Sequence, residues 1–194
     1  MDFATYRKCV ALYKLCDNEG PLYLHNFGEP LLNPMLPDFV EYATRNDVEV
    51  SFFTNGVDNN RKPFSLDVWE DLYQKGLRVV NFSEHIMKAD VFEEEIGHLI
   101  NINRVFTPRK KNLHNWAGQT ENPLANNTEQ RPCIFETSNA MVILWNGRIS
   151  TCCIDSEGMR SNIYVEDILS QGWYAFTEIE LCKTCSLMRN PELI

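Results

Sequence analysis

Apolar and polar positions along residues 1–118 form blocks that switch between helical and strand spacing. Apolar residues that recur every three or four positions predict helices over about 3–16, 34–44, 65–75 and 90–98. Shorter apolar runs between these blocks predict strands at about 22–24, 48–54, 77–82 and 100–106. Because strands that alternate with helices pair in parallel through right-handed crossovers, we expect an α/β fold for this region.

Capping and turn residues support these bounds. Ser65 precedes the third predicted helix, where its side chain can cap free backbone N–H groups, and Gly76 ends the same helix. Gly20-Pro21 ends the first helix, and Asn55-Gly56 closes the strand at 48–54.

The chain changes character at residues 119–132, which are rich in Asn, Gln, Thr and Pro and nearly lack large apolar side chains. We interpret this stretch as a linker between a first domain, residues 1–118, and a second domain, residues 133–194. In the second domain, Asn146-Gly147 between apolar runs at 140–145 and 148–153 predicts a β-hairpin with a type I′ turn. Short helices are expected near 164–170 and 173–180.

The composition, 44% hydrophobic and 23% charged among 194 residues, is typical of a globular protein with its own core. A net charge of −9 repels phosphate backbones, so we expect no nucleic-acid partner. No apolar run is long enough to span a bilayer, and charges are spread through the N-terminal region, which predicts neither a membrane segment nor a signal peptide. We therefore expect a cytoplasmic protein.

The seven cysteines are the compositional anomaly, because five of them lie in the last third of the chain. Intracellular cysteines grouped in this way favour metal or cluster ligation over disulfides. Cys182 and Cys185 form a C-x2-C pair, and the predicted hairpin can bring Cys133 near Cys152. Two such pairs supply four thiolates, the number that a 4Fe–4S cluster or a structural zinc ion requires.

The other cysteines and the histidines have simpler explanations. Cys153 adjoins Cys152, and because adjacent strand residues point to opposite faces, we expect only one of them to bind; we favour Cys152 and keep Cys153 as the alternative. Cys9 and Cys16 share one face of a predicted helix, which favours core packing. The histidines show no ligand spacing, and we expect each to be structural or exposed: His25, His85, His98 and His114.

Residues 133–185 resemble the SPASM-type auxiliary-cluster domain that follows the barrel in many radical SAM enzymes. The resemblance is carried by a hairpin that ends in Cys-Cys-x-Asp at 152–155, by an Asn-Ile step at 162–163 and by the closing C-x2-C pair; Ser161 stands where the family has glycine. It implies one 4Fe–4S cluster, whereas full SPASM domains carry more cysteines and two clusters. The implied ligands are Cys133, Cys152, Cys182 and Cys185.

Residues 21–57 are similar to two strands of a radical SAM barrel. Gly28-Glu29-Pro30 resembles the family's G-E-P segment, whose acidic residue helps to hold the amino group of S-adenosylmethionine, and Thr54-Asn55-Gly56 resembles the end of the next strand. Family members also carry a C-x3-C-x2-C motif ahead of this segment, where this chain has only Cys9 and Cys16. We therefore expect a truncated radical-SAM-like βα barrel that lacks the first strand and its cluster loop.

This resemblance leaves the G-E-P segment with two interpretations. Gly28, Glu29 and Pro30 would be a vestigial cofactor site whose present role is to shape a turn, or Glu29 would still bind an amine-bearing ligand. We favour the first interpretation, and expect neither bound S-adenosylmethionine nor a catalytic residue in this chain.

Three functions remain open. The first is a cluster-binding protein without radical chemistry, which acts in electron transfer, in redox sensing or as an accessory protein. The second is a radical SAM-type enzyme that is completed in trans or acts on a peptide or small-molecule substrate. The third is a zinc-stabilised interaction domain. A sheet of about four strands also leaves edges that a redox or protein partner, or a second copy of the chain, would cover.

Overall fold

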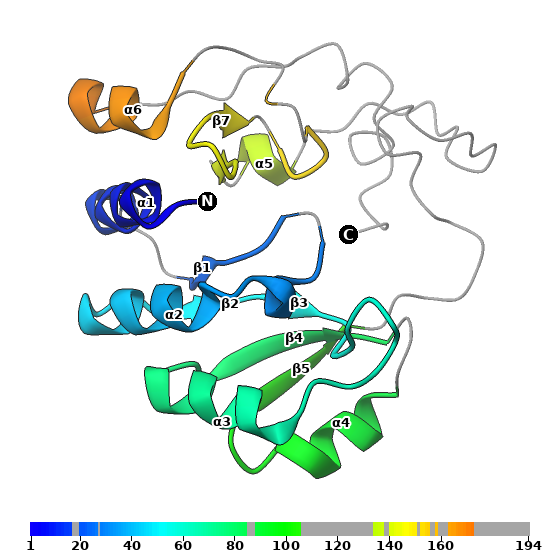
Figure 1. Cartoon of the computed structure of the whole chain (residues 1–194). Coiled ribbons are helices and arrows are strands. Elements are labelled where there is room, and N and C mark those ends of the chain that lie inside the picture. Colours follow the sequence, from blue (N-terminus) through cyan, green and yellow to red (C-terminus); the bar gives the residue numbers. More distant parts are fainter. Residues whose placement is uncertain are drawn as a thin grey trace, which may run out of the picture. The chain divides into compact units, whose positions relative to one another are not determined.

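The computed structural model describes residues 1–16, 20–26, 28–84, 88–105, 134–137, 140–150, 152–155, 158 and 163–172. The chain forms two compact units, one of residues 9–107 and one of residues 1–8 with 108–194 (Figure 1). The border between the units lies inside α1 (Phe3–Leu15), the helix expected at 3–16. The linker expected at 119–132 and the helix expected at 173–180 lie outside the described residues, so the domain borders stay a prediction.

The 9–107 unit is built on parallel strands, as expected. The strands are β1 (Leu22–Tyr23), β2 (Val50–Ser51), β3 (Phe53–Thr54), β4 (Val79–Ser83) and β5 (Asn101–Val105). β1 pairs with β2, β3 pairs with β4, and β4 pairs with β5, all in parallel. The strand expected at 48–54 is split at Phe52, but Phe52 O still accepts from Asn81 N at 2.9 Å. β2 and β3 therefore run as one strand between β1 and β4.

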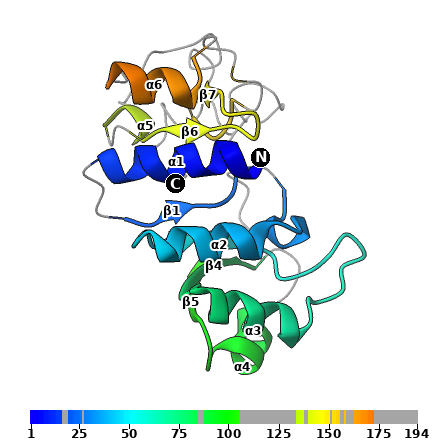
Figure 2. The same cartoon turned by 60° about the vertical axis from the view of Figure 1, so that its left-hand side comes forward.

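The helices of this unit lie between the strands in sequence. They are the 3-10 helix η1 (Pro30–Leu32) and the α-helices α2 (Leu36–Arg45), α3 (Leu66–Lys75) and α4 (Ala89–Ile96). Right-handed crossovers between neighbouring parallel strands place the connecting helices on one face of the sheet. Figures 1 and 2 show α3 and α4 on the same side of β4 and β5.

The ends of α3 show which capping predictions hold. Ser65 is extended and precedes the helix, but its side chain makes no capping hydrogen bond, so the predicted cap is wrong in that respect. Gly76 ends the helix in a left-handed conformation with φ of 115°, as glycine does at helix C-termini. A side chain at position 76 would also collide with Thr44, so glycine is required there for two reasons.

One face of the sheet is covered by the helices and forms the apolar core. Phe52, Val80 and Phe82 are fully buried. Phe92 of α4 stacks on Phe82 with ring centroids 4.3 Å apart, and Trp69 of α3 meets Phe92 edge-on at 5.0 Å. These aromatic contacts hold two helices and the central strand together.

The other unit, residues 1–8 with 108–194, contains the expected hairpin and is called the hairpin unit below. Its elements are α5 (Ile134–Thr137), β6 (Val142–Ile143), β7 (Ile149–Ser150) and α6 (Val165–Gln171), and β6 pairs with β7 in antiparallel register. Both strands are shorter than expected, whereas α6 matches the helix expected at 164–170. The interior of this unit is apolar, and among the described residues it includes Leu144, Ile149, Ile154, Val165 and Ile168.

The turn of this hairpin differs from the prediction. A type I′ turn needs a positive φ at Asn146 and at Gly147, but only Gly147 has one, at 83°. Gly147 N donates to Leu144 O, and Leu144 N donates to Arg148 O, both at 2.9 Å. The loop is therefore a type I turn followed by a glycine bulge, because Gly147 alone supplies the left-handed step that closes the hairpin.

None of the described helices combines the length and the apolar character that crossing a bilayer requires.

Lys8 forms an ion pair with Glu166 inside the hairpin unit.

Candidate functional site

The structure describes only one of the four predicted cluster ligands. Cys152 lies just beyond β7, whereas Cys133, Cys182 and Cys185 lie outside the described residues. Cys152 and Cys153 are both half-buried and belong to a turn rather than to a strand. The argument that strand geometry separates their side chains is therefore wrong, because β7 ends at Ser150, and the choice between the two cysteines stays a prediction.

The turn that carries Cys152 is held by a buried hydroxyl group. Ser150 Oγ lies 2.9 Å from Cys152 O, 2.9 Å from Asp155 O and 3.0 Å from Asp155 Oδ2. Ser150 and Asp155 are at most 1% exposed. Asp155 N also donates to Cys152 O at 3.3 Å. These bonds fix the backbone on both sides of Cys152 and Cys153.

Metal-binding groups are not assembled within the described part of the chain. No group of three or more His, Cys, Asp or Glu side chains that could hold a metal ion occurs among the described residues. Of the other described cysteines, Cys9 is buried in α1 as expected for core packing, but Cys16 is exposed just beyond the end of that helix. The core assignment is therefore wrong for Cys16.

Glu29 joins two neighbouring strand ends. Its side chain accepts hydrogen bonds from Leu31 N at 3.2 Å, from Thr54 Oγ1 at 2.7 Å and from Asn55 N at 2.9 Å. Pro30 follows it as the first residue of η1 and is buried. Gly28 precedes it with φ of 93°. The G-E-P segment thus links the turn after β1 to the end of β3, which is what a turn-shaping role requires; ligand binding by Glu29 stays a prediction.

Two amide oxygens near this segment are buried without a hydrogen-bond partner. Asn26 Oδ1 follows β1, and Asn55 Oδ1 follows β3, the next strand of the sheet. Buried polar atoms are nearly always paired, and an unpaired one points to a bound water, ion or ligand group. The carboxyl ends of parallel strands, where both residues lie, are the usual position of ligand sites in α/β proteins.

A row of polar side chains crosses the face of the sheet opposite to the one that carries Phe52 and Phe82. Ser51 and Asn81 are at most 8% exposed. Asn81 Nδ2 donates to Ser51 Oγ at 3.1 Å, and Asn103 Nδ2 donates to Asn81 Oδ1 at 3.4 Å. Sequence reasoning missed this row, although alternate polar residues within apolar strands were its visible signal.

His25 lies at one end of the same face, in an aromatic setting. Its ring centroid is 5.7 Å from that of Tyr23 and 4.7 Å from that of Phe53. Phe53 N donates to His25 Nδ1 at 3.4 Å. Burial disfavours the charged imidazolium and lowers the pKa of His25 to about 4. His25 is therefore neutral at physiological pH.

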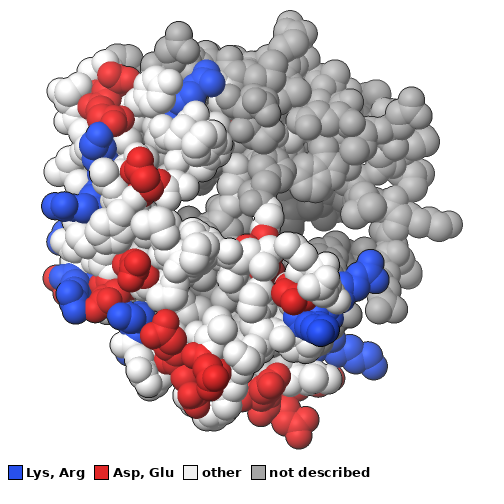
Figure 3. All heavy atoms as spheres, viewed as in Figure 1, with Lys and Arg blue, Asp and Glu red and all other residues white. Residues whose placement is uncertain are grey.

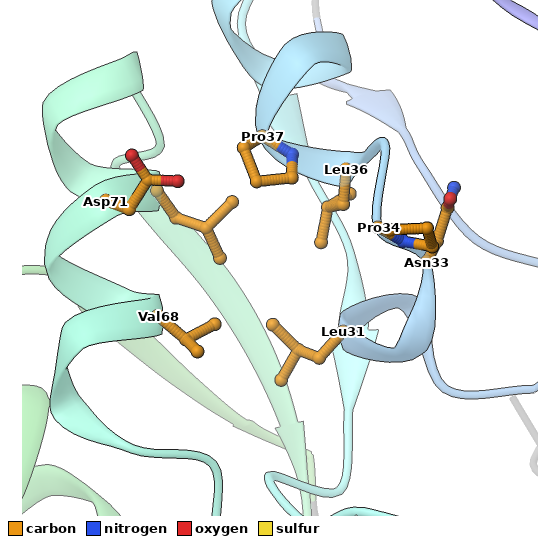
Figure 4. A pocket seen from close by; sticks show the side chains of 8 residues that line it. Leu31, Asn33, Pro34, Leu36, Pro37, Val68 and Asp71 are labelled. Atoms are coloured by element: carbon orange, nitrogen blue, oxygen red, sulfur yellow. The ribbon is translucent and has the colours of Figure 1, made fainter.

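A hollow in the 9–107 unit is a weaker candidate. It has a volume of about 200 Å³ and lies where η1 and α2 meet α3 (Figure 4). Its lining is mainly Leu, Pro and Val side chains, with only Asn33 and Asp71 as polar groups. Ligand pockets are larger and converge several polar groups, so this hollow is packing space.

Charged side chains do not form a patch of one sign over the described part of the surface seen in Figure 3. Acidic and basic side chains are interspersed there, and several form ion pairs, such as Lys75 with Glu41 at 2.7 Å. The absence of a nucleic-acid partner stays a prediction from the net charge of −9.

Comparison with known proteins gives structural neighbours but no sequence relatives. No known family profile and no curated protein matches the sequence. The crystal structure of BtrN in complex with AdoMet and 2-DOIA matches with a TM-score of 0.68 and 20% identity, over 97% of this chain and 74% of BtrN. Selenomethionine BtrN in an open conformation matches with a TM-score of 0.58 and 19% identity, over 97% and 73%. The chain therefore has a mixed α/β fold with parallel strands that is similar to the fold of BtrN.

Proposed function

We propose that this chain is a 4Fe–4S protein on a radical-SAM-like fold, with Cys133, Cys152, Cys182 and Cys185 as the cluster ligands. The observation that carries the proposal is the hairpin, which ends in a turn that holds the half-buried Cys152. Thiolate sulfur is the donor that such clusters take, so this part of the site fits the group. The fold similarity to BtrN supports the same proposal.

Four thiolates would leave the cluster without an open iron, which suits electron transfer, redox sensing or an accessory role. Cys9 and Cys16 are not arranged as a second set of cluster ligands. One is buried in α1 and the other is exposed beyond it, so the pair does not form a cysteine loop ahead of Glu29. We also propose that a redox partner or a second copy of the chain covers the edges of the sheet.

Metal analysis tests the cluster directly. The chain is purified without oxygen and assayed for iron, acid-labile sulfide and zinc, and the reduced protein is examined by electron paramagnetic resonance. We expect a brown protein with equal amounts of iron and sulfide, and a Cys16→Ala variant with unchanged iron content. A colourless protein that contains one zinc ion would support the interaction domain instead, and a protein without either metal after reconstitution would refute both.

A second candidate is favoured by the unpaired oxygens of Asn26 and Asn55 next to Glu29. Hydrogen-bond acceptors beside a carboxylate suit an amine-bearing ligand, and AdoMet is present in the BtrN complex. If the chain binds AdoMet, calorimetry under anaerobic conditions should detect binding that Glu29→Gln weakens. Formation of 5′-deoxyadenosine with a reductant, alone or with a cluster-bearing partner, would identify an enzyme and overturn the assignment without radical chemistry.

A further inference from the structure

The loop between β3 and α3 carries two cations without an ion-pair partner. Figures 1 and 2 show this loop extending away from the sheet of the 9–107 unit. An isolated antiparallel bridge between Val57 and Pro63 closes its base, so we call it the 57–63 loop. Arg61 and Lys62 are exposed in it, and their side chains form no ion pair with any residue that the structure describes.

The tip of the 57–63 loop is fixed by its own backbone and by one carboxylate. Arg61 N donates to Asp58 O at 2.9 Å, and Asp58 N donates to Lys62 O at 2.8 Å. Asp58 Oδ1 accepts from Lys62 N at 2.9 Å and from Asn60 N at 2.8 Å. The hydrogen bond from Lys62 N and the further bonds from Asn60 lower the pKa of Asp58. The two cations therefore start from a preorganised backbone, which reduces the entropy lost on binding.

Arg61 occupies a position that the hairpin loop of the other unit gives to glycine. There, Gly147 N donates to Leu144 O and Leu144 N donates to Arg148 O, which is the same pattern of bonds. Gly147 has a φ of 83°, and Arg61 has a φ of 60°. This left-handed conformation suits glycine, whereas a residue with a Cβ atom adopts it at a cost. Loop stability alone therefore does not explain an arginine at position 61, and such strain is found at functional positions.

The exposed pair of cations suits carboxylate groups on another protein. The planar guanidinium group of Arg61 can hold both oxygens of one carboxylate, and Lys62 adds a second charge next to it. Small-molecule sites are concave, whereas this loop projects. Nucleic acid would extend beyond the loop over a chain with a net charge of −9, whereas a short acidic peptide segment would meet mainly the two cations.

We propose that the 57–63 loop docks a short acidic segment of a partner protein, with Arg61 as the main contact and Lys62 as the second. The left-handed backbone at Arg61 is the cost at which the loop presents a guanidinium group where glycine would close it more easily. This inference goes beyond the proposed function and does not depend on the cluster. It also concerns a loop rather than the edges of the sheet.

Two peptides that differ only in charge test the proposal. The full chain, labelled with ¹⁵N, is titrated at neutral pH and low salt with hexaglutamate and with hexaglutamine, both blocked at their ends. We expect hexaglutamate to shift the Arg61 Nε and the Asn59 side-chain signals, and hexaglutamine to leave them unchanged. Raising the salt concentration to about 0.2 M should weaken the binding of hexaglutamate, because exposed charges are screened.

Variants at position 61 separate binding from stability. Arg61→Gly should weaken hexaglutamate binding by about fivefold, because a charge-assisted contact is lost, and should raise the urea midpoint of the 9–107 unit, because glycine removes the strain. Arg61→Lys keeps the charge and should retain most of the binding. Arg7→Gln removes an exposed cation from α1 in the other unit and should change neither property.

Four results would overturn the proposal. The first is that hexaglutamate does not shift the loop signals, or that hexaglutamine shifts them as strongly. The second is an equal loss of binding in Arg7→Gln and in Arg61→Gly. The third is an Arg61→Gly protein that is less stable than the wild type, which would show that the arginine serves the fold. The fourth is a thymidine oligonucleotide that binds the loop more tightly than hexaglutamate, which would identify a nucleic-acid contact instead.

Discussion

The 9–107 unit and the hairpin unit differ in how far apart in sequence their stabilising contacts lie. In the 9–107 unit, the aromatic core joins Trp69, Phe82 and Phe92 from three separate elements, and parallel pairing joins β1 to β2 across more than two dozen residues. In the hairpin unit, some of the described bonds around β7 join near neighbours, such as Ser150 to Asp155, and others reach the residues just before α6, such as Ile149 N to Ile163 O at 2.9 Å. Both units bury apolar side chains, but the second has short strands that, in our proposal, also depend on the cluster.

Because of this difference, we expect each unit to lose its folded structure without the other unfolding. A parallel sheet with its helices has an apolar core of its own. A two-stranded hairpin is marginal in water without further support, which cluster ligation can provide by coupling binding to folding. The following predictions test this contrast from the largest expected effect to the smallest.

Loss of a cluster ligand should have the largest effect. Cys182→Ala is expected to reduce the iron content to background and to abolish the hydrogen-exchange protection of β6 and β7, because the cluster and the hairpin fold together. Protection of the Val80 and Phe82 amides should persist. Cys16→Ala, which changes an exposed cysteine, serves as the control. Loss of protection in both units would contradict the contrast, and unchanged iron would contradict the ligand assignment.

Removal of a core aromatic residue should have the converse effect. Trp69→Ala is expected to destabilise the 9–107 unit by about 3–5 kcal/mol, because it leaves a cavity beside Phe92. Iron content should stay at the wild-type level. The measurement is hydrogen exchange at Val80 together with an iron assay, and a joint loss of protection and iron would show that the two units fold as one.

Much of the 9–107 unit was predictable because its signals are local. Apolar spacing located the helices. The end of α3 at Gly76 was predictable from the residue type, because glycine readily adopts the left-handed conformation found at helix C-termini. The predicted turn at Asn146-Gly147 was wrong because two loop types share that dipeptide, and the hydrogen bond from Gly147 to Leu144 distinguishes them only in the structure.

The site residues show the same limit. The spacing of Cys182 and Cys185 can be read from the sequence, but the partners of Glu29 cannot, because Thr54 is brought to it by the parallel pairing of the strands. His25 was expected to be structural or exposed. The sequence alone could not show that the rings of Tyr23 and Phe53 lie beside it, because these contacts form only in the folded sheet. The polar row was missed for a related reason: its members are far apart in sequence and meet only across the sheet.

The pH dependence of stability should distinguish the two units through His25. The folded pKa of about 4 lies below the value of about 6.5 in the unfolded chain, so at acidic pH the unfolded state takes up a proton that the folded state does not. This contribution is fully present above pH 6.5 and decreases as the pH falls towards 4. We expect the 9–107 unit to lose on the order of 2 kcal/mol between pH 7 and pH 5.

Urea unfolding followed by the Val80 methyl signal measures this loss. His25→Phe keeps an aromatic ring beside Tyr23 and Phe53 and should remove most of the pH dependence. His98→Gln changes an exposed histidine after α4 and serves as the control. Equal pH dependence in His25→Phe and in the wild type would show that another group titrates.

The smallest effect is expected at the hydroxyl group that holds the Cys152 turn. Ser150→Ala removes the hydroxyl that lies within hydrogen-bond distance of Cys152 O and Asp155, which should destabilise the hairpin unit by about 1–2 kcal/mol. Because the turn positions a proposed ligand, the variant should keep its iron but change the electron paramagnetic resonance spectrum or the reduction potential. Ser170→Ala removes an exposed hydroxyl bond to Asp167 O and should change neither. A Ser150→Ala protein that is less stable but spectroscopically unchanged would limit Ser150 to a structural role and place the cluster away from this turn.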